Sequence, residues 1–310
     1  MNRPANNPYR RNVYSGQRPI SPVRQAGAAG SFAAQDFQNY SRARYGSSAG
    51  GRHAAARKRG PWRAVFVVAA LVLAVCLGVL GVILYGYWNG TKVYDEIAES
   101  AFTAQEANAL EGMTVDWDAL LAQNPDTVGW VYMPGTSIDY PIVQGETDEE
   151  YLRTDFQGNQ GLIVSKGAIF LSTVNAADFS DQNNFIYGHN MNDDTMFAHV
   201  LQMAEQEVFD ETRTFFILTP DCNYRCTTLS LEVVDSTQTE LIQTGFSGES
   251  GMLGYVEDRR QNSVVDAFMD EGELESVSKL FTLITCGDDY AATRAVLVGG
   301  VVEEAVPANS

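Results

Sequence analysis

The feature that most constrains this chain is an uncharged apolar run from Ala64 to Trp88, "AVFVVAALVLAVCLGVLGVILYGYW". At about 1.5 Å per residue, a helix of this length exceeds the roughly 30 Å thickness of the bilayer hydrocarbon. Aromatic residues, whose amphipathic rings favour the membrane interface, stand at both ends of the run: Trp62 at one end, and Tyr85, Tyr87 and Trp88 at the other. We therefore predict one transmembrane helix over residues 64–88.

Charge is divided unevenly about this run. Residues 1–63 contain twelve Lys and Arg and one acid, Asp36, for a net charge of +11, whereas the remainder, with 38 acids and nine bases, carries −29. Because positive flanks stay inside, we predict a single-pass signal anchor with a cytoplasmic N-terminus and an extracellular C-terminal domain. A cleaved signal peptide is disfavoured, since both the run and its leader are too long. The acidic balance of the large part argues against nucleic acid as its partner.

The rest of the chain divides by composition. Residues 1–63 are rich in Gly, Ala, Ser, Asn, Pro and Arg without periodicity, which predicts a disordered basic tail that fixes orientation or contacts anionic membrane lipid. An interrupted amphipathic pattern predicts a helical stalk and further helices over 89–123. Residues 124–304 form the predicted main domain, followed by a short tail at 305–310.

Short β-type runs separated by turn residues fill the main domain. Two lie about the Pro-Gly turn of 129–145, and the others are at 161–165, 167–171, 183–189, 214–219, 226–234, 279–286 and 294–302. Two helical patches interrupt them, at 194–205 and 251–269. Many short strands with few helices predict a mainly β fold built as a closed or nearly closed barrel.

The four cysteines have different settings. Cys76 lies in the membrane run and acts there as a small apolar side chain. Cys222 and Cys226 flank a predicted hairpin turn, where they form either a short-loop disulfide or two free thiols. Cys286, which ends the apolar run "KLFTLITC", is left over. An odd thiol in an extracellular domain is either a buried structural residue or a nucleophile.

A nucleophilic thiol needs a neighbouring base or cation that favours the thiolate. Of the three histidines, His53 lies in the tail, His199 lies in a helical patch as a surface or packing residue, and His189 follows an apolar strand in a turn-like setting. Arg294 opens the apolar run after Cys286. We predict Cys286 as the nucleophile, His189 as the general acid and base, and Arg294 as the charge that stabilises an oxyanion or holds the substrate. The plainer alternatives are a hydrogen-bonded turn histidine and an exposed strand arginine.

These residues lie in motifs that resemble the sortases, membrane-anchored cysteine transpeptidases of Gram-positive bacteria, and class B most closely. The motifs are "TLITC" ending at Cys286, "TRAVLVG" with Arg294, and "IYGHNMNDDTMF" around His189, with further similarity at 124–145, 151–159 and 167–171. The patch at 251–269 resembles the helix that class B inserts before the cysteine strand. The resemblance covers about residues 120–302.

The resemblance implies a sortase-type eight-stranded β-barrel with added helices. It implies that Cys286 attacks the Thr carbonyl of a C-terminal sorting signal in a secreted protein, that His189 moves protons to and from the amines, and that Arg294 binds the Thr carbonyl region. By the same analogy Tyr187 and Thr285 line the substrate groove. The acceptor would be an amine of peptidoglycan or its precursor, and the chemistry requires no metal or cofactor.

Some features remain open at the level of sequence. Class B implies NPxTx-like sorting motifs, but Ile284 stands where its members often have a small hydroxyl residue, which leaves the motif undetermined. A pilin-polymerising sortase with a lysine acceptor and a simple cysteine endopeptidase are alternatives. A fourth reading is a tethered binding domain without activity, against which the set of Cys286, His189 and Arg294 argues.

Overall fold

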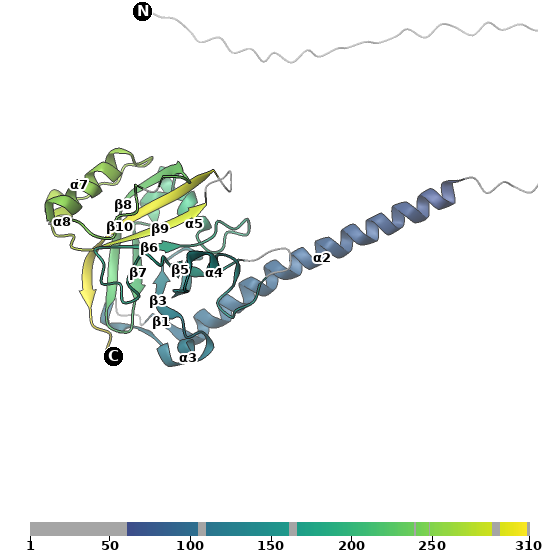
Figure 1. Cartoon of the computed structure of the whole chain (residues 1–310), viewed down its shortest axis with the longest axis horizontal. Helices are drawn as coiled ribbons and strands as arrows, with labels where there is room; N and C mark the ends of the chain where they lie inside the picture. The colour runs from purple at the N-terminus through teal and green to yellow at the C-terminus, as the bar shows by residue number, and fades with distance from the viewer. Residues whose placement is uncertain are drawn as a thin grey trace, which may run out of the picture. The chain divides into compact units, whose positions relative to one another are not determined.

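The computed structural model describes residues 61–104, 110–160, 166–238, 240–247, 249–286 and 292–308. Nearly all of the predicted disordered tail and the predicted strand at 161–165 lie outside these residues. The described residues contain a long helix, a small two-stranded sheet and a closed barrel (Figure 1).

Among the described residues, eight strands close the barrel in the order β10-β8-β7-β3-β4-β5-β6-β9, with β9 paired to β10. The pairs β4–β5 and β6–β9 are parallel and the other pairs are antiparallel. The strands are β3 (Thr127–Tyr132), β4 (Asp139–Val143), β5 (Ile169–Leu171), β6 (Asn183–Tyr187), β7 (Thr214–Leu218), β8 (Asn223–Asp235), β9 (Leu280–Cys286) and β10 (Thr293–Ala305). The prediction of a mainly β, eight-stranded sortase-type barrel is confirmed.

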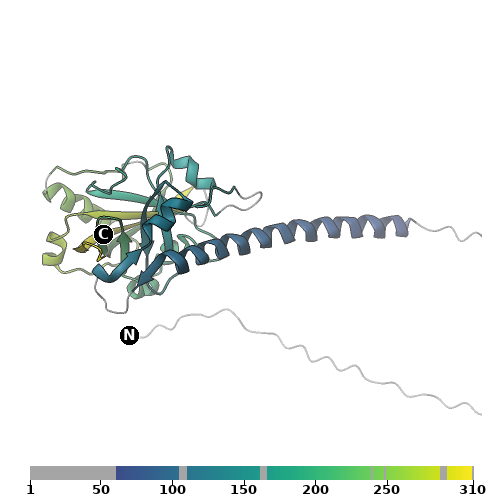
Figure 2. The same cartoon turned by 90° about the horizontal axis from the view of Figure 1, so that it is seen from below.

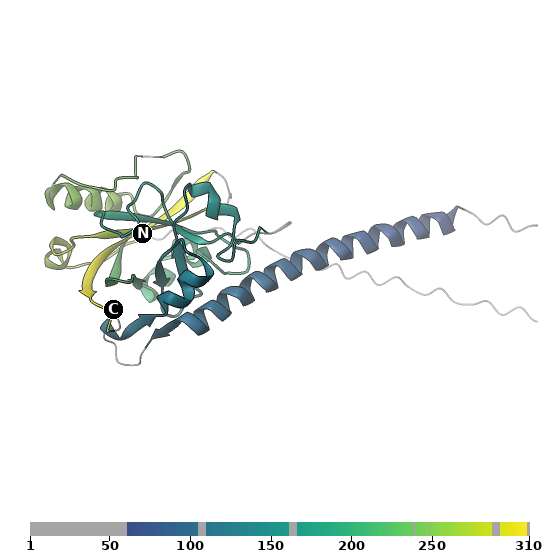
Figure 3. The ribbon, with the colours of Figure 1, turned by 60° about the horizontal axis from the view of Figure 1, so that its bottom comes forward.

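Strands β9 and β10 bury both of their faces. One face packs into the barrel interior through Phe281, Leu283, Ala295 and Leu297. The other face joins a second apolar cluster with α7 (Glu249–Gln261) through Leu280, Ile284, Val296 and Val298. Helices α7 and α8 (Glu271–Glu275) lie together on the outside of the barrel (Figure 3). Because side chains alternate along a strand, burial of both faces explains why these segments are continuous apolar runs.

Helix α2 (Trp62–Ala101) is a single unbroken helix of 40 residues (Figure 2). Its apolar part is not buried against the protein, and it is long and apolar enough to cross a membrane by length and composition. Only the C-terminal turns contribute buried residues: Tyr94, Ile97 and Ala101. The predicted membrane run and the beginning of the predicted stalk are therefore parts of one helix.

The prediction of a helical stalk and further helices over 89–123 is wrong at residues 102–104 and 113–115, which form strands. Strand β1 (Phe102–Ala104) pairs antiparallel with β2 (Met113–Val115). The short 3₁₀ helix η1 (Leu110–Gly112) directly precedes β2. The ring of Phe102 stacks on Trp130 of the barrel at a centroid distance of 5.9 Å. Packing of this aromatic residue against the barrel outweighs the helical periodicity. Helix α3 (Trp117–Gln123) then begins at Asp116, whose Oδ1 accepts a hydrogen bond from the Ala119 amide at 2.9 Å.

The helical patch predicted at 194–205 is largely replaced by shorter elements. Asp194 and Met196 have φ of 59° and 57°, in the left-handed region that a right-handed helix does not admit. Helix α5 (Ala198–Gln202) can therefore start only after them, and α6 (Gln206–Glu211) follows as an unpredicted helix. A short helix α4 (Asp148–Arg153) was also not predicted.

The helix predicted at 251–269 ends early, at Gln261. The Ser263 hydroxyl accepts from the Leu231 amide at 3.0 Å, and the Val264 amide donates to the Leu231 carbonyl at 2.8 Å. These bonds hold the chain against β8, so its backbone groups are used there and not in a continuing helix.

Candidate active site

The three residues predicted to carry the chemistry belong to neighbouring strand ends. Strands β6 and β9 are parallel with Tyr187 opposite Ile284, so His189, two residues later, is level with Cys286 at the end of β9. On the other side of β9, Arg294 is the antiparallel register partner of Cys286. The three positions thus meet at one end of the barrel, across three adjacent strands, although they are far apart in the sequence.

A pocket of about 270 Å³ opens at this end of the sheet. Four of the predicted residues line it: Tyr187, His189, Thr285 and Arg294. For Cys286, the structure describes the backbone position at the end of β9. The pocket therefore gathers the predicted acid–base residue, the predicted cation and both predicted groove residues around one space.

The imidazole of His189 is confined by two backbone segments. Its Nε2 atom lies 2.5 Å from the Leu152 carbonyl oxygen. Because a carbonyl can only accept, this bond places the proton on Nε2 and leaves Nδ1 as the basic nitrogen of the neutral ring. On the other side, a Cβ added to Gly167 would lie only 2.9 Å from the ring Cδ2, so Gly167, at φ 58°, leaves room that another residue would fill. The ring orientation is thus fixed by its surroundings.

Arg294 and Tyr187 form the adjoining wall of the pocket. Arg294 is half-buried, and its Nη1 donates to the Thr293 carbonyl at 3.0 Å. Burial raises the pKa of Tyr187 to about 12, with Asp148 adding to the rise and Arg294 opposing it, so the phenol stays neutral at physiological pH. The Tyr187 ring stacks on Phe170 at 5.4 Å between centroids. A cation and an apolar aromatic surface therefore lie side by side.

Thr285 presents a hydroxyl with no partner among the described residues. The residue is only 2 % exposed, and its Oγ1 makes no hydrogen bond within the part of the chain that the structure describes. A buried polar group left in this state costs about 1–3 kcal/mol. Because Thr285 lines the pocket, a ligand bound there would be placed to supply the missing partner.

Several supporting residues were not found from the sequence. Leu152 and Gly167 act through a backbone carbonyl and an absent side chain, neither of which a residue pattern reveals. Asp148 lines the pocket and accepts hydrogen bonds from the Ser172 hydroxyl and the Thr173 amide, at 2.9 and 2.7 Å. The sequence did carry a signal for α4, and so for Asp148: the acidic residues in its first turn, a position that favours acidic side chains.

The other candidate residues have structural settings. Cys222 and Cys226 are free thiols, so the disulfide alternative is wrong. Residues four apart near one extended strand are separated by about 13 Å, beyond the reach of a disulfide. Burial raises the pKa of both thiols. His199 is half-buried with its Nε2 3.1 Å from Thr212 Oγ1, as expected of a packing residue.

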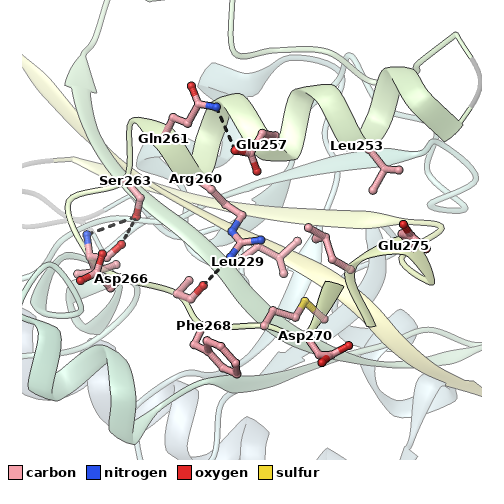
Figure 4. Close-up of a pocket in the computed structure, with 14 residues that line it drawn as sticks. Leu229, Leu253, Glu257, Arg260, Gln261, Ser263, Asp266, Phe268, Asp270 and Glu275 are labelled. Carbon is pink, nitrogen blue, oxygen red and sulfur yellow. Dashed lines mark hydrogen bonds between the residues drawn. The ribbon is translucent and has the colours of Figure 1, made fainter. Parts of the chain in front are cut away.

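A larger pocket, of about 860 Å³, lies between α7, α8 and residues 263–270 (Figure 4). Two of its polar side chains are already paired: Arg260 donates to the Ala267 carbonyl at 3.0 Å, and Gln261 donates to Glu257 at 3.0 Å. No cysteine or histidine is among its lining residues. Size alone therefore does not mark the reactive site, and the smaller pocket at the strand ends is the candidate.

Comparison with known proteins agrees with this geometry. No protein-family model matches the chain. Sortase B of Listeria monocytogenes is 28 % identical over 244 residues, which cover 74 % of this chain and 96 % of the relative. Sortase B of Staphylococcus aureus is 25 % identical over 243 residues, or 75 % of this chain and 97 % of the relative.

Solved structures give the same result. Sortase B from Bacillus anthracis, in complex with AAEK1, matches 71 % of this chain and 99 % of its own at 26 % identity and a TM-score of 0.59. A Staphylococcus aureus sortase B–substrate complex matches 60 % of this chain and 84 % of its own at 26 % identity and a TM-score of 0.53. The chain is therefore similar to class B sortases in both sequence and fold. This similarity supports a cysteine transpeptidase, and the closed eight-stranded barrel is the fold that sortase B structures share.

Proposed function

We propose that this sortase is anchored in the cell membrane, cleaves a C-terminal sorting signal after Thr, and joins the product to an amine of peptidoglycan or its precursor. The observation that carries the proposal is the strand register, which brings the positions of His189, Cys286 and Arg294 to one end of the barrel. The similar Staphylococcus aureus structure is a sortase B–substrate complex, which supports a bound substrate for this chain as well.

In the first proposed step, the Cys286 thiolate attacks the carbonyl carbon of the Thr residue and a C–S bond forms. The carbonyl electron pair moves to oxygen, where the Arg294 guanidinium stabilises the negative charge. When the intermediate collapses, the C–N bond breaks and the leaving amine takes a proton from the His189 imidazolium. A thioacyl-enzyme remains, with a neutral imidazole beside it.

In the second proposed step, His189 accepts a proton from the incoming amine, whose nitrogen attacks the thioester carbonyl. The C–S bond breaks, the new amide forms and the thiolate is regenerated together with the imidazolium. The thioester conserves the energy of the cleaved peptide bond, so the transfer needs no nucleotide. Water in place of the amine would give hydrolysis, so access of the two nucleophiles decides the product.

We further propose that α2 is the membrane anchor. The apolar part of α2 has the required length and composition, and the basic residues before it predict a cytoplasmic N-terminus and an extracellular catalytic domain. This placement suits cell-wall anchoring in a Gram-positive bacterium, where sorting signals and acceptor amines are both outside the cell.

The decisive experiment uses the full chain in detergent micelles, a set of fluorogenic NPxTx-type peptides, and triglycine as the amine. Mass spectrometry is expected to show the peptide ligated to triglycine. Hydrolysis alone would indicate an endopeptidase, and preference for a lysine side chain as acceptor would indicate a pilin-polymerising enzyme. Absence of any turnover would favour a tethered binding domain without activity.

Three variants assign the roles. Cys286→Ala is expected to abolish both cleavage and ligation, and cleavage by this variant would reject the mechanism. His189→Ala and Arg294→Ala are each expected to lower kcat/KM by at least about 100-fold, the usual contribution of an acid–base residue or an oxyanion donor.

A further inference from the structure

A buried lysine ties α2 to the loops beside the candidate active site. The ammonium group of Lys166, whose side chain is 3 % exposed, lies within hydrogen-bond distance of three oxygens. These are Oγ1 of Thr91 on α2 at 2.6 Å, Oδ2 of Asp193 at 2.7 Å and Oγ1 of Thr195 at 2.8 Å. An ammonium has three donors, so all three are used. Lys166 therefore joins three segments of the chain at one point.

The hydrogen bonds within this cluster favour the charged form of Asp193. Partial burial opposes ionisation of Asp193, but the hydrogen bonds from Lys166 and Thr195 outweigh it, so the pKa of Asp193 lies below its ordinary value. The α2 backbone leaves space for the lysine stem, since a Cβ added to Gly90 would lie 3.1 Å from the Lys166 Cδ. The cluster is thus shaped for lysine at this position.

A second link starts from Tyr94, one turn further along α2. Its buried hydroxyl donates to the Gly167 carbonyl at 2.7 Å and accepts from the Phe156 amide at 3.2 Å. Its ring meets Tyr140 edge-to-face at 5.3 Å, and the Tyr140 hydroxyl accepts from the Met196 amide at 3.0 Å. Through these contacts the end of α2 touches chain segments on both sides of the candidate site.

Both links end at the segments that confine His189. Lys166 and Gly167 are consecutive. Gly167 lies against the imidazole ring of His189 and against the Leu152 carbonyl, which accepts a hydrogen bond from that ring. Asp193 and Thr195 belong to the loop after His189, and the next residues return to it, where the Phe197 amide donates to the His189 carbonyl at 2.8 Å. The imidazole therefore lies against one segment that α2 secures, and the backbone of His189 is bonded to the other.

We propose that Lys166 and Tyr94 are positioning residues for the sortase reaction, through which the end of α2 fixes the orientation and tautomer of His189. The inference rests on the proposed acid–base role of His189. It makes the helix that carries the apolar run a part of the catalytic apparatus: displacement of α2 from the barrel would release the 166–167 segment and disorient the ring.

The test compares Tyr94→Phe and Lys166→Met with wild type, all as full chains in detergent micelles. Tyr94→Phe removes one hydroxyl and keeps the ring, and Lys166→Met keeps the stem and removes the charge. With NPxTx-type peptide and triglycine, we expect kcat to fall about tenfold while KM changes less than about twofold, since small misplacement of a reacting group lowers the chemical step. Lys92→Ala, which alters an exposed ion pair with Glu96 on the same helix, is the matched control and is expected to leave kcat unchanged.

A spectroscopic measurement separates positioning from general stability. The chain has three histidines, so ¹⁵N-histidine labelling gives few signals, and His189→Gln assigns the relevant one. At a pH where the ring carries a single proton, wild type is expected to hold that proton on Nε2, and both variants are expected to show a mixture of tautomers. Tautomer ratios and kcat that match wild type would overturn the inference, as would a lower kcat with an unchanged tautomer.

The proposed function and the inference can fail separately. Absence of ligation by wild type would remove the function itself, whereas active wild type with unaffected variants would remove only the positioning role. Should Lys166→Met fail to fold, Tyr94→Phe alone decides the question, because its buried ring and its packing on Tyr140 remain.

Discussion

The Thr285 hydroxyl is expected to contribute to peptide binding and not to the stability of the fold. Its Oγ1 is buried at the pocket without a partner among the described residues. Thr285→Val is expected to raise KM for the peptide about fivefold, the equivalent of one hydrogen bond of about 1 kcal/mol. The variant should be at least as stable as wild type, because it buries no unsatisfied hydroxyl.

Steady-state kinetics and thermal unfolding check this prediction for Thr285. Thr285→Ser, which keeps the hydroxyl, serves as the control and should retain the wild-type KM. Equal KM values for the Val and wild-type proteins would show that the hydroxyl does not meet the peptide.

Asp139 should make stability depend on pH. Burial raises the pKa of Asp139 to about 6, although the hydrogen bond from Trp130 Nε1, at 2.8 Å, opposes the rise. The folded state therefore holds the proton more tightly than the unfolded chain does. Stability conferred at this site is greatest below the ordinary carboxyl pKa of 3.8, falls as pH rises towards about 6, and stays low above it.

Asp139→Asn removes this penalty while its side-chain oxygen can still accept from Trp130. We expect the variant to gain about 1 kcal/mol at pH 7.5, after a discount for partial exposure, and nothing below about pH 4. Urea unfolding at the two pH values measures the difference. An equal gain at both would mean that ionisation of Asp139 is not its source.

Among the helices and strands, the sequence predicted best those whose apolar pattern is contained within the segment itself. The runs that became β9 and β10 could be recognised because both of their faces are buried, and the hairpin-like order placed Cys286 near Arg294. The β1–β2 sheet was missed because Phe102 follows a helical pattern and is extended only through its packing on Trp130. The early end of α7 depends on Ser263 and Leu231, which are distant in sequence.

In the candidate site as well, some residues could be predicted from the sequence and others could not. Reactive side chains such as His189 and Arg294 could be selected by residue type, and the structure brings both to one pocket. Their supports could not be selected, because the Leu152 carbonyl and the space at Gly167 have no signature in residue type. Roles carried by backbone atoms become visible only when the chain is folded.

Helix α7 is held to the barrel by an ion pair that should be costly to break. Arg259 on α7 lies 3.3 Å from Glu232 on β8, with side chains 11 % and 6 % exposed. Burial raises the pKa of Glu232, and Arg259 only partly opposes it. Arg259→Met leaves the buried carboxylate unpaired, so we expect a loss of about 3 kcal/mol in unfolding free energy.

A second ion pair on β8 provides the comparison for Arg259. Arg225 and Glu303 are 42 % and 46 % exposed, so Arg225→Met is expected to cost less than about 1 kcal/mol. The double variant Arg259→Met with Glu232→Leu should recover most of the loss, since no charge is then buried alone. Chemical unfolding of the four proteins gives the values, and equal losses for the two single Arg variants would refute the distinction.

At the scale of the whole molecule, α2 combines two environments in one uninterrupted element. Its first part is apolar and unburied, and its last turns belong to the core of the barrel domain through Tyr94, Ile97 and Ala101. A continuous helix has no internal joint, so the folded domain and the proposed membrane anchor meet without a flexible linker. The boundary of the folding unit therefore lies inside the helix, and does not coincide with a break in secondary structure.

Two truncations locate that boundary. A chain that begins at residue 89 lacks the apolar run but keeps the buried turns of α2, so it should be soluble and melt within a few degrees of the full chain. A chain that begins at residue 102 also loses Tyr94, Ile97 and Ala101. Removing two large buried side chains and one small one costs about 4–6 kcal/mol of apolar burial. Because domains of this kind have only about 5–15 kcal/mol to lose, this chain should be largely unfolded or aggregated. Circular dichroism and size-exclusion chromatography distinguish the two outcomes, and equal melting of both truncations would place the end of α2 outside the folding unit.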